Sequence, residues 1–425
     1  MAAYTAMSRE ELSALRAALR KEYEEYQAKG LKLDMSRGKP GAKQLDLSEG
    51  MLSVVSTSEQ AKISGVDARN YGGLDGLPEM KALFAEMLGV APSEVIVGGN
   101  SSLNMMYDTV MRAMLFGVLG ATPWSKLPCV KFLCPSPGYD RHFAICEAFG
   151  IEMIPVAMRE DGPDMDEVER LVSADAAIKG IWCVPKYSNP GGVTYSDAVV
   201  RRFAALRPAA EDFRIFWDNA YVVHDLYDTS DALLNILDEC RKAGRENLCY
   251  IFASTSKVTF PGAGVAAMAA SEDNLASIRK MLGFQTIGPD KLNQLRHIRF
   301  FKDLNGVRAH MRRHAEIIRP KFKIVLNTLQ NELSGLDIAD WHKPNGGYFI
   351  SLNVLPGCAK AVHALLKEAG VVMTGAGATY PYGKDPEDRN LRIAPTFPTE
   401  QELQTAADML CLCVKLAACE KLLSK

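Results

Sequence analysis

One lysine stands where it could act as a nucleophile. Lys257 ends the tract Ser254–Lys257, which directly follows the apolar run Tyr250–Ala253, so we expect it at the end of a buried strand. Burial disfavours the ammonium form and lowers the pKa of a lysine, as the formation of a Schiff base with a carbonyl compound requires. The alternative is a lysine whose stem lies along the protein while its amine reaches water.

Three more polar side chains follow other strand-like runs. Asp218 comes after the run Arg214–Trp217, Tyr221 follows three residues later, and Asn189 lies in the tract after Gly180–Val184. A buried carboxylate can keep a pyridine nitrogen protonated, which makes the ring an electron sink. A phenol and an amide could bond to a ring hydroxyl. Alternatively, Asp218 caps the next helix and Asn189 belongs to an ordinary Asn-Pro-Gly-Gly turn.

Two further places could bind anions. The turn Gly98–Ser102 joins a predicted strand to a helix, and backbone N–H groups at a helix N-terminus suit a phosphate. Arg392 lies in the strand-like run Leu391–Ala394, where a guanidinium would bind a carboxylate in a bidentate manner or form a structural ion pair. The turn Gly262–Gly264 is not a dinucleotide-binding motif, because the third glycine and the following helix are missing.

These residues follow apolar runs that alternate with amphipathic stretches. The alternation predicts an α/β fold with a mostly parallel sheet between helices, in which ligands bind at the carboxyl ends of the strands. The expected strands are Val95–Val97, Val130–Cys134, Met153–Val156, Gly180–Val184, Ile215–Trp217, Tyr250–Ala253 and Val265–Ala269. The expected helices among them are Leu77–Leu88, Leu103–Leu115, Arg141–Phe149 and Asp164–Val172.

The length of 425 residues suggests two domains. We expect an N-terminal arm with part of the small domain in residues 1–50, a large domain in 51–300 and a smaller α+β domain in 301–425. A capping box at Ser8 and Glu11 begins a helix that runs to about Tyr26. The later elements are a helical tract from about Asn293 to Leu333, strands Gly347–Leu352 and Leu391–Ala394, and helices Ala359–Ala369 and Glu400–Leu423.

The composition limits which binding partners and which cellular compartment we expect. The formal net charge of −2 gives no overall field that would favour nucleic acid or an anionic membrane. Ten scattered cysteines without metal-site spacing indicate free thiols in a reducing, cytoplasmic compartment and no metal centre. A signal peptide is not expected, because the N-terminus has no basic stretch leading into an apolar run. A membrane span is not expected either, because no window reaches about 18 apolar residues.

Taken together and in this order, the motifs resemble those of the fold-type-I pyridoxal-phosphate-dependent aminotransferases, over residues 37–398. The resemblance implies pyridoxal 5'-phosphate (PLP) as cofactor, carried by Lys257, and a large PLP-binding domain beside a small one. It also implies that Tyr139, in Pro135–Tyr139, stacks on the pyridine ring, while Asp218, Tyr221 and Asn189 contact its polar atoms.

The resemblance also assigns the anion sites. Gly99, Asn100, Ser101, Ser254 and Ser256 would hold the cofactor phosphate, and Arg392, Gly38 and Asn189 would hold the α-carboxylate of the substrate. Tyr71, in the motif Tyr71–Gly76, would reach the phosphate of a neighbouring subunit's cofactor. We therefore expect a homodimer with active sites at its interface.

One position departs from the family pattern. Most relatives place an arginine after the lysine to neutralise the phosphate, whereas here Gly264 stands at that position in Pro261–Val265. The phosphate should then depend on Ser254, Ser256, Tyr71 and backbone N–H groups. The departure is similar to that of a divergent bacterial group of aspartate aminotransferases, which is the reason to expect aspartate as substrate.

The implied reaction moves the amino group of L-aspartate to 2-oxoglutarate in two half-reactions, giving oxaloacetate and L-glutamate. A dicarboxylate needs a second cation, and the candidates are Arg37, Lys39, Arg141 and Lys186, with the loop around Gly38 favoured. The alternatives are an aminotransferase for aromatic amino acids, alanine or kynurenine, or a PLP lyase. A DNA-binding regulator would need a basic segment before the PLP domain, and a nucleotide-dependent dehydrogenase would need a glycine fingerprint.

Overall fold

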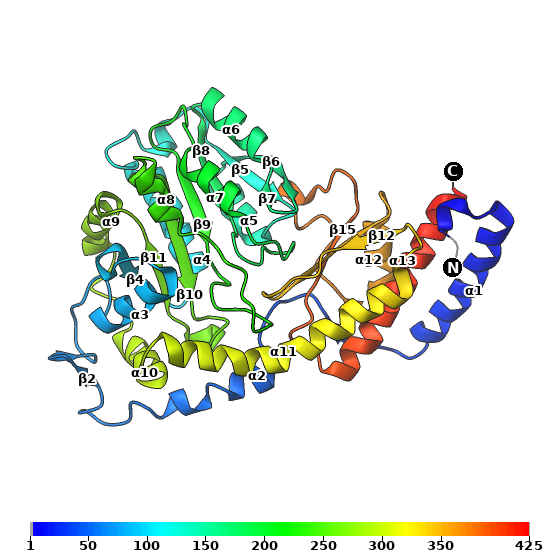
Figure 1. The fold of residues 1–425 in the computed structure, drawn as a ribbon, viewed down its shortest axis with the longest axis horizontal. Coiled ribbons are helices and arrows are strands. Elements are labelled where there is room, and N and C mark those ends of the chain that lie inside the picture. The colour runs from blue at the N-terminus through cyan, green and yellow to red at the C-terminus, as the bar shows by residue number, and fades with distance from the viewer. Residues whose placement is uncertain (1–2, 425) are drawn as a thin grey trace.

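The computed structural model describes residues 3–424, which form two lobes (Figure 1). The larger lobe contains an eight-stranded sheet with the order β4-β11-β10-β9-β8-β5-β6-β7. Within the described residues, β11 pairs antiparallel with β10 and β4, β7 pairs antiparallel with β6, and the other pairs are parallel. The prediction of a mostly parallel sheet is therefore confirmed.

All seven predicted strands belong to this sheet, and the short edge strand β7 adds an eighth. Their bounds are β4 (Val95–Val97), β5 (Lys131–Ser136), β6 (Glu152–Arg159), β7 (Gly162–Pro163), β8 (Ile178–Cys183), β9 (Arg214–Asp218), β10 (Cys249–Ser254) and β11 (Ala266–Ala269). A two-residue hairpin, β2 (Lys62–Ile63) with β3 (Val66–Asp67), lies outside the sheet.

Helices cover both faces of the sheet because the central strands are apolar on both sides. In β9, for example, Phe216 packs into one core while Ile215 and Trp217 pack into the other. The Phe216 core is covered by α4 (Ser102–Phe116), α5 (Asp140–Ala148) and α9 (Glu272–Gln285). The opposite core is covered by α3 (Pro78–Leu88), α6 (Met165–Ala174), α7 (Asp197–Ala204), α8 (Ile236–Lys242) and α10 (Lys291–Phe301).

The smaller lobe joins the N-terminal arm to the C-terminal part of the chain. Its elements are α1 (Arg9–Gln27), β1 (Leu33–Asp34), α2 (Ala42–Asp46), β12 (Ala339–Trp341), β13 (Ile350–Val354), α12 (Ala359–Glu368), β14 (Val371–Val372), β15 (Asn390–Ile393) and α13 (Glu400–Leu423). Ser8 and Glu11 form the predicted capping box. The strand expected from Gly347 begins later, at Ile350, because Gly347 has a φ of +80° and leaves the extended conformation.

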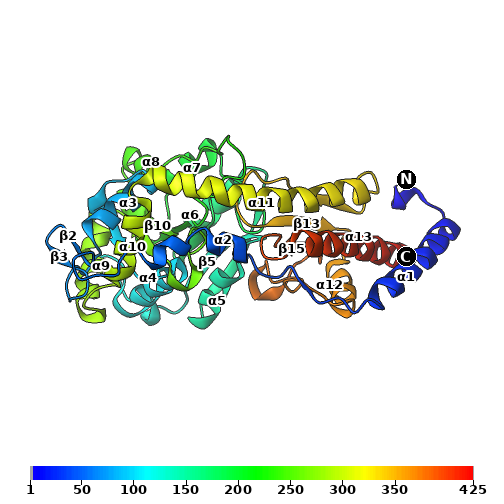
Figure 2. The same ribbon diagram turned by 90° about the horizontal axis from the view of Figure 1, so that it is seen from below.

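One long helix, α11 (Leu304–Leu333), spans both lobes (Figure 2). Val307 and Met311 pack into the larger lobe, whereas Phe322 and Leu329 pack into the smaller one beside α13. The helical tract expected from Asn293 to Leu333 is two helices, because Lys302 has a φ of +68° and Asp303 caps α11. We propose that the domains divide near residues 50 and 300, with α11 packed on both.

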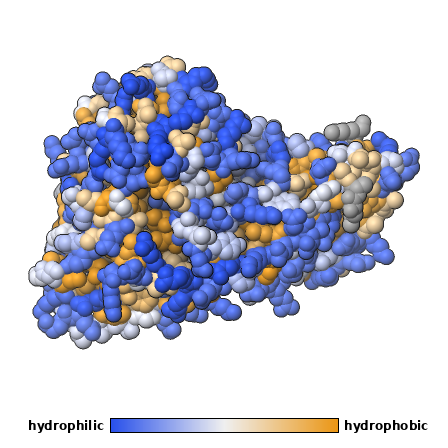
Figure 3. All heavy atoms as spheres, viewed as in Figure 1, coloured by the Kyte–Doolittle hydropathy of each residue, from blue (hydrophilic) through white to orange (hydrophobic). Residues whose placement is uncertain are grey.

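Hydrophilic side chains cover most of the face shown in Figure 3, with hydrophobic ones exposed between them. None of the helices in residues 3–424 is long and apolar enough to cross a membrane.

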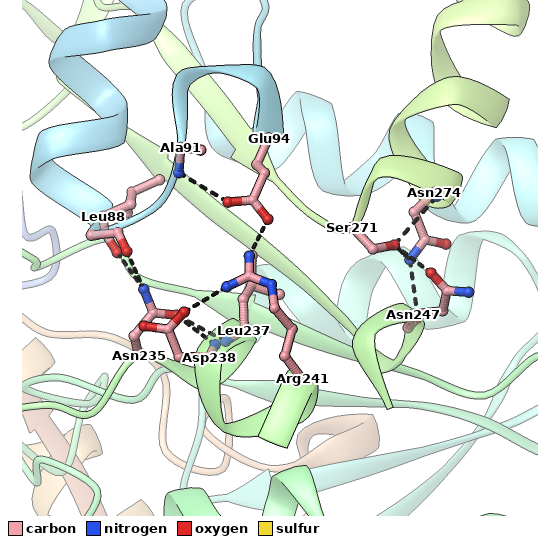
Figure 4. Close-up of polar contacts among 11 residues, drawn as sticks. Leu88, Ala91, Glu94, Asn235, Leu237, Asp238, Arg241, Asn247, Ser271 and Asn274 are labelled. Carbon is pink, nitrogen blue, oxygen red and sulfur yellow. Dashed lines mark hydrogen bonds and ion pairs between the residues drawn. The ribbon is translucent and has the colours of Figure 1, made fainter. Parts of the chain in front are cut away.

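Polar contacts connect the end of α3 to the start of α8 (Figure 4). The Asn235 side chain accepts hydrogen bonds from the first turn of α8 and donates to the carbonyls of Leu88 and Gly89. Glu94 pairs with the guanidinium of Arg241. The groove beside these contacts is lined by charges that largely pair with one another, so we assign this region a structural role.

Candidate active site

A cavity of about 230 Å³ lies at the carboxyl ends of the parallel strands. Residues from distant parts of the chain meet there because β8, β9 and β10 end at the same edge of the sheet. The predicted residues on its wall are Gly38, Ser101, Tyr139, Asn189, Asp218, Tyr221, Ser254, Ser256 and Lys257.

Lys257 follows β10 and faces two aromatic rings. Its Nζ lies 5.0 Å from the centre of the Tyr221 ring and 5.9 Å from that of Tyr348. Removal from water lowers the pKa of Lys257, and the nearby Asp218 carboxylate opposes this shift. A lysine whose pKa is lowered is more often neutral and therefore nucleophilic.

Asp218 ends β9 with its side chain almost fully buried. Its Oδ2 lies 3.0 Å from Nε2 of His142, whose ring stacks on Trp182 with centres 4.5 Å apart. Its Oδ1 is buried and has no hydrogen-bond partner among the described residues. A buried carboxylate oxygen that accepts no hydrogen bond costs free energy. A bound molecule with a donor group would therefore be stabilised at this atom.

Two tyrosines in the cavity wall are held in the phenol form. Burial raises the pKa of Tyr139 to about 12, with Asp218 and Asp140 adding to the shift. Burial raises the pKa of Tyr221 well above its usual value. Both phenols can therefore donate a hydrogen bond at neutral pH.

The predicted phosphate site lies at the start of α4. Ser101 is the N-cap residue of that helix and lines the cavity with Ser254 and Ser256. Gly99 and Asn100 are exposed and do not line the cavity, and the Ser256 hydroxyl donates to the Asn100 carbonyl at 2.8 Å.

Gly264 packs directly against this site. A Cβ atom at Gly264 would lie 3.0 Å from the N, Cα and Oγ atoms of Ser256. The close approach of the two backbones gives a physical reason for glycine at this position, where the resemblance alone would predict arginine.

Arg392, on β15, lies beside the cavity rather than on its wall. Its guanidinium pairs with Asp140 at 2.8 Å and donates to Asn189 Oδ1 at 3.3 Å and to Thr374 Oγ1 at 3.1 Å. The Phe349 ring lies 4.9 Å from it. Arg392 is 7% exposed and already bonded on several sides, so a substrate carboxylate would share or displace these partners.

Several predicted residues lie outside the cavity. Tyr71 is 81% exposed, and Arg37 and Arg141 are also exposed. Lys186 is buried, where it pairs with Asp225 at 2.9 Å and lines a different groove. Of the four candidates for the second cation, Lys39 alone lines the cavity.

Sequence reasoning missed His142, Trp182, Asp140 and Tyr348. His142 could have been predicted from its spacing. It follows Tyr139, the residue expected to stack on the ring, by three positions, which places both on the same face of α5. The others come from separate elements with no shared spacing. Within residues 3–424, no group of three His, Cys, Asp or Glu side chains could hold a metal ion.

Comparison with known proteins agrees with this geometry. The family model described as "Aspartate amino-transferase" matches residues 7–425. An aspartate aminotransferase of Corynebacterium glutamicum is 47% identical over 403 residues, which cover 95% of this chain and 93% of that protein. A crystal structure of an aspartate transaminase from the same species superposes with a TM-score of 0.96 at 45% identity and covers 99% of each chain.

A more distant structure shares the fold. An α-aminoadipate aminotransferase of Thermus thermophilus, complexed with N-(5'-phosphopyridoxyl)-L-leucine, has a TM-score of 0.75 at 20% identity and covers 92% of this chain and 93% of that one. Fold and site together define a PLP-dependent aminotransferase of fold type I. Within that class, the chain belongs to the aspartate aminotransferase family.

Proposed function

We propose that this cavity binds PLP and that the enzyme transfers the amino group of L-aspartate to 2-oxoglutarate. The observation that carries the proposal is the buried, unpartnered Oδ1 of Asp218 in the same cavity as Lys257. A protonated pyridine nitrogen would supply the missing donor, and a lysine with a lowered pKa would supply the amine. The residues therefore fit the cofactor.

Each side chain has a distinct task in this proposal. When bound, PLP supplies an electron sink for the charge that develops at the substrate Cα. Asp218, held by His142, keeps the ring nitrogen protonated. Tyr221 and the amide of Asn189 donate to the ring hydroxyl, and Tyr139 covers the ring face.

Lys257 moves the proton of the reaction. With PLP bound, Nζ of Lys257 would be placed to take the proton from the substrate Cα and to hold it for its return. The lowered pKa suits this task, because the amine must accept a proton at neutral pH. Ser101, Ser254, Ser256 and the backbone N–H groups around Gly99 and Asn100 hold the phosphate at the start of α4.

The choice of aspartate is supported by the Corynebacterium relatives, which are named for that substrate. Arg392 would bind the α-carboxylate beside Gly38 and Asn189. An aminotransferase for aromatic amino acids, alanine or kynurenine would use the same cofactor residues and remains the alternative, as does a PLP lyase. Activity that requires a 2-oxo acid acceptor separates an aminotransferase from a lyase.

We also propose a homodimer in the cytoplasm. Tyr71 is 81% exposed and away from the cavity of its own subunit, as expected of a residue that serves the partner's cofactor. The cysteines of residues 3–424 form no disulfide, which suits a reducing compartment.

Three measurements test the proposal. Reduction of the PLP-loaded protein with borohydride, followed by peptide mapping, should place the cofactor on Lys257, and Lys257→Ala should fold but show no transamination. Initial rates with L-aspartate, L-alanine, L-phenylalanine and L-kynurenine, each with 2-oxoglutarate, should be highest for aspartate. Label on another lysine would refute the site, and faster turnover of another amino acid would refute the substrate.

A further inference from the structure

We propose that Lys39 determines the specificity for acidic substrates by binding the distal carboxylate. This inference deepens the proposed function and rests on it. Lys39 and Lys257 are the only two cationic residues on the cavity wall among the described residues. Because Lys257 serves the cofactor and Arg392 the α-carboxylate, Lys39 is the cation of this subunit that is left for a second carboxylate.

The loop that carries Lys39 is held on several sides. The Lys39 N–H donates to the Arg37 carbonyl at 2.9 Å, and the Lys39 carbonyl accepts from the buried hydroxyl of Thr396, also at 2.9 Å. The following residue, Pro40, is buried. These bonds fix the backbone at Lys39, so binding of an anion costs mainly the freedom of its exposed side chain.

The charge of Lys39 is not neutralised within the subunit. Lys39 forms no ion pair with any of residues 3–424. Its Nζ lies over the Phe397 ring, 3.8 Å from the centre. An aromatic face orients an ammonium without cancelling its charge, so Nζ keeps its attraction for a carboxylate.

The other candidates are less suitable for physical reasons. Lys186 already pairs with the Asp225 carboxylate and faces another groove. Arg37, Arg141 and Lys39 are all exposed, but of these three only Lys39 lines the cavity. Arg37 lies two residues before Lys39 on the same loop and so provides a matched control.

The test compares Lys39→Met with Arg37→Met in the PLP-loaded enzyme. The first readout is the ratio of kcat/KM for L-aspartate to that for L-alanine. The second is the Kd of succinate and of propionate, measured from the change in cofactor absorbance without turnover. A lost charge-assisted contact should lower the selectivity ratio and weaken succinate binding by about 10- to 100-fold, with propionate unaffected.

The controls separate this inference from the proposed function. Arg37→Met should keep the wild-type preference for L-aspartate over L-alanine, measured as the ratio of the two kcat/KM values. Lys39→Arg should keep part of that preference. If Lys39→Met keeps both the ratio and the succinate Kd while the wild type prefers aspartate, Lys39 has no such role and the proposed function stands. A wild type that does not prefer aspartate overturns the proposed function and this inference with it.

Discussion

The contact between Gly38 and Phe349 gives a quantitative test of how the substrate carboxylate is held. A Cβ atom at Gly38 would lie 2.4, 2.8 and 3.1 Å from three atoms of the Phe349 ring. Because carbon atoms prefer a separation of about 3.5 Å or more, Gly38→Ala requires the ring to move by about 1 Å. Phe349 is buried and lies against the Arg392 guanidinium, so this movement displaces the carboxylate-binding group.

Overpacking of this kind costs about 1–3 kcal/mol of free energy. If all of that cost falls on substrate binding, the binding equilibrium weakens by about 5- to 150-fold. We expect Gly38→Ala to raise the KM for the amino acid within that range and to change PLP affinity less, because the Phe349 ring lies against Arg392. Gly262→Ala is the control, because a Cβ atom there meets nothing within 4 Å. An unchanged KM, or an equal loss of PLP affinity, would refute the reasoning.

Three further predictions concern the cofactor, the fold and pH. Gly264→Ala should weaken PLP binding in equilibrium dialysis by about 5-fold or more, because its Cβ presses on Ser256 at 3.0 Å; tighter binding would contradict this. Asn235→Ala should lower the free energy of unfolding by about 1–3 kcal/mol through the lost cap of α8, and an unchanged thermal midpoint would argue against it. Burial lowers the pKa of His297 from 6.5 to about 4, so between these values the unfolded chain binds a proton that the folded one does not, and stability rises with pH. The free energy of unfolding of the apoenzyme can be measured in urea from pH 4.5 to 6.5. For His297→Gln it should rise with pH less steeply than for the wild type, by up to about 1.4 kcal/mol per pH unit. Equal slopes for the two proteins would contradict this.

The sheet could be predicted from the sequence because its strands are continuous apolar runs between turn residues. Val95–Val97 and Glu400–Leu423 coincide with observed elements, and the other strands of the large sheet differ by a few residues at their ends. The break at Lys302 could not be predicted, because the apolar periodicity continues through it and a positive φ leaves no mark in the pattern.

The residues at the cofactor end of the site could also be predicted from the sequence. Lys257, Asp218 and Asn189 follow parallel strands or lie in the loops after them, and parallel strands bring their carboxyl ends to one edge. The substrate end depends on the packing of the smaller lobe. The ion pair of Arg392 with Asp140 joins residues 252 positions apart, and no spacing rule indicates it.

The visible absorption spectrum of the PLP-loaded protein, before and after addition of L-aspartate without any oxo acid, tests the central claim most directly. The proposed function predicts that the band of the lysine-bound cofactor is lost and that one equivalent of oxaloacetate is released per site. A band that does not respond to aspartate would contradict the proposed substrate. A protein that develops no band even after incubation with PLP would contradict the assignment of the site.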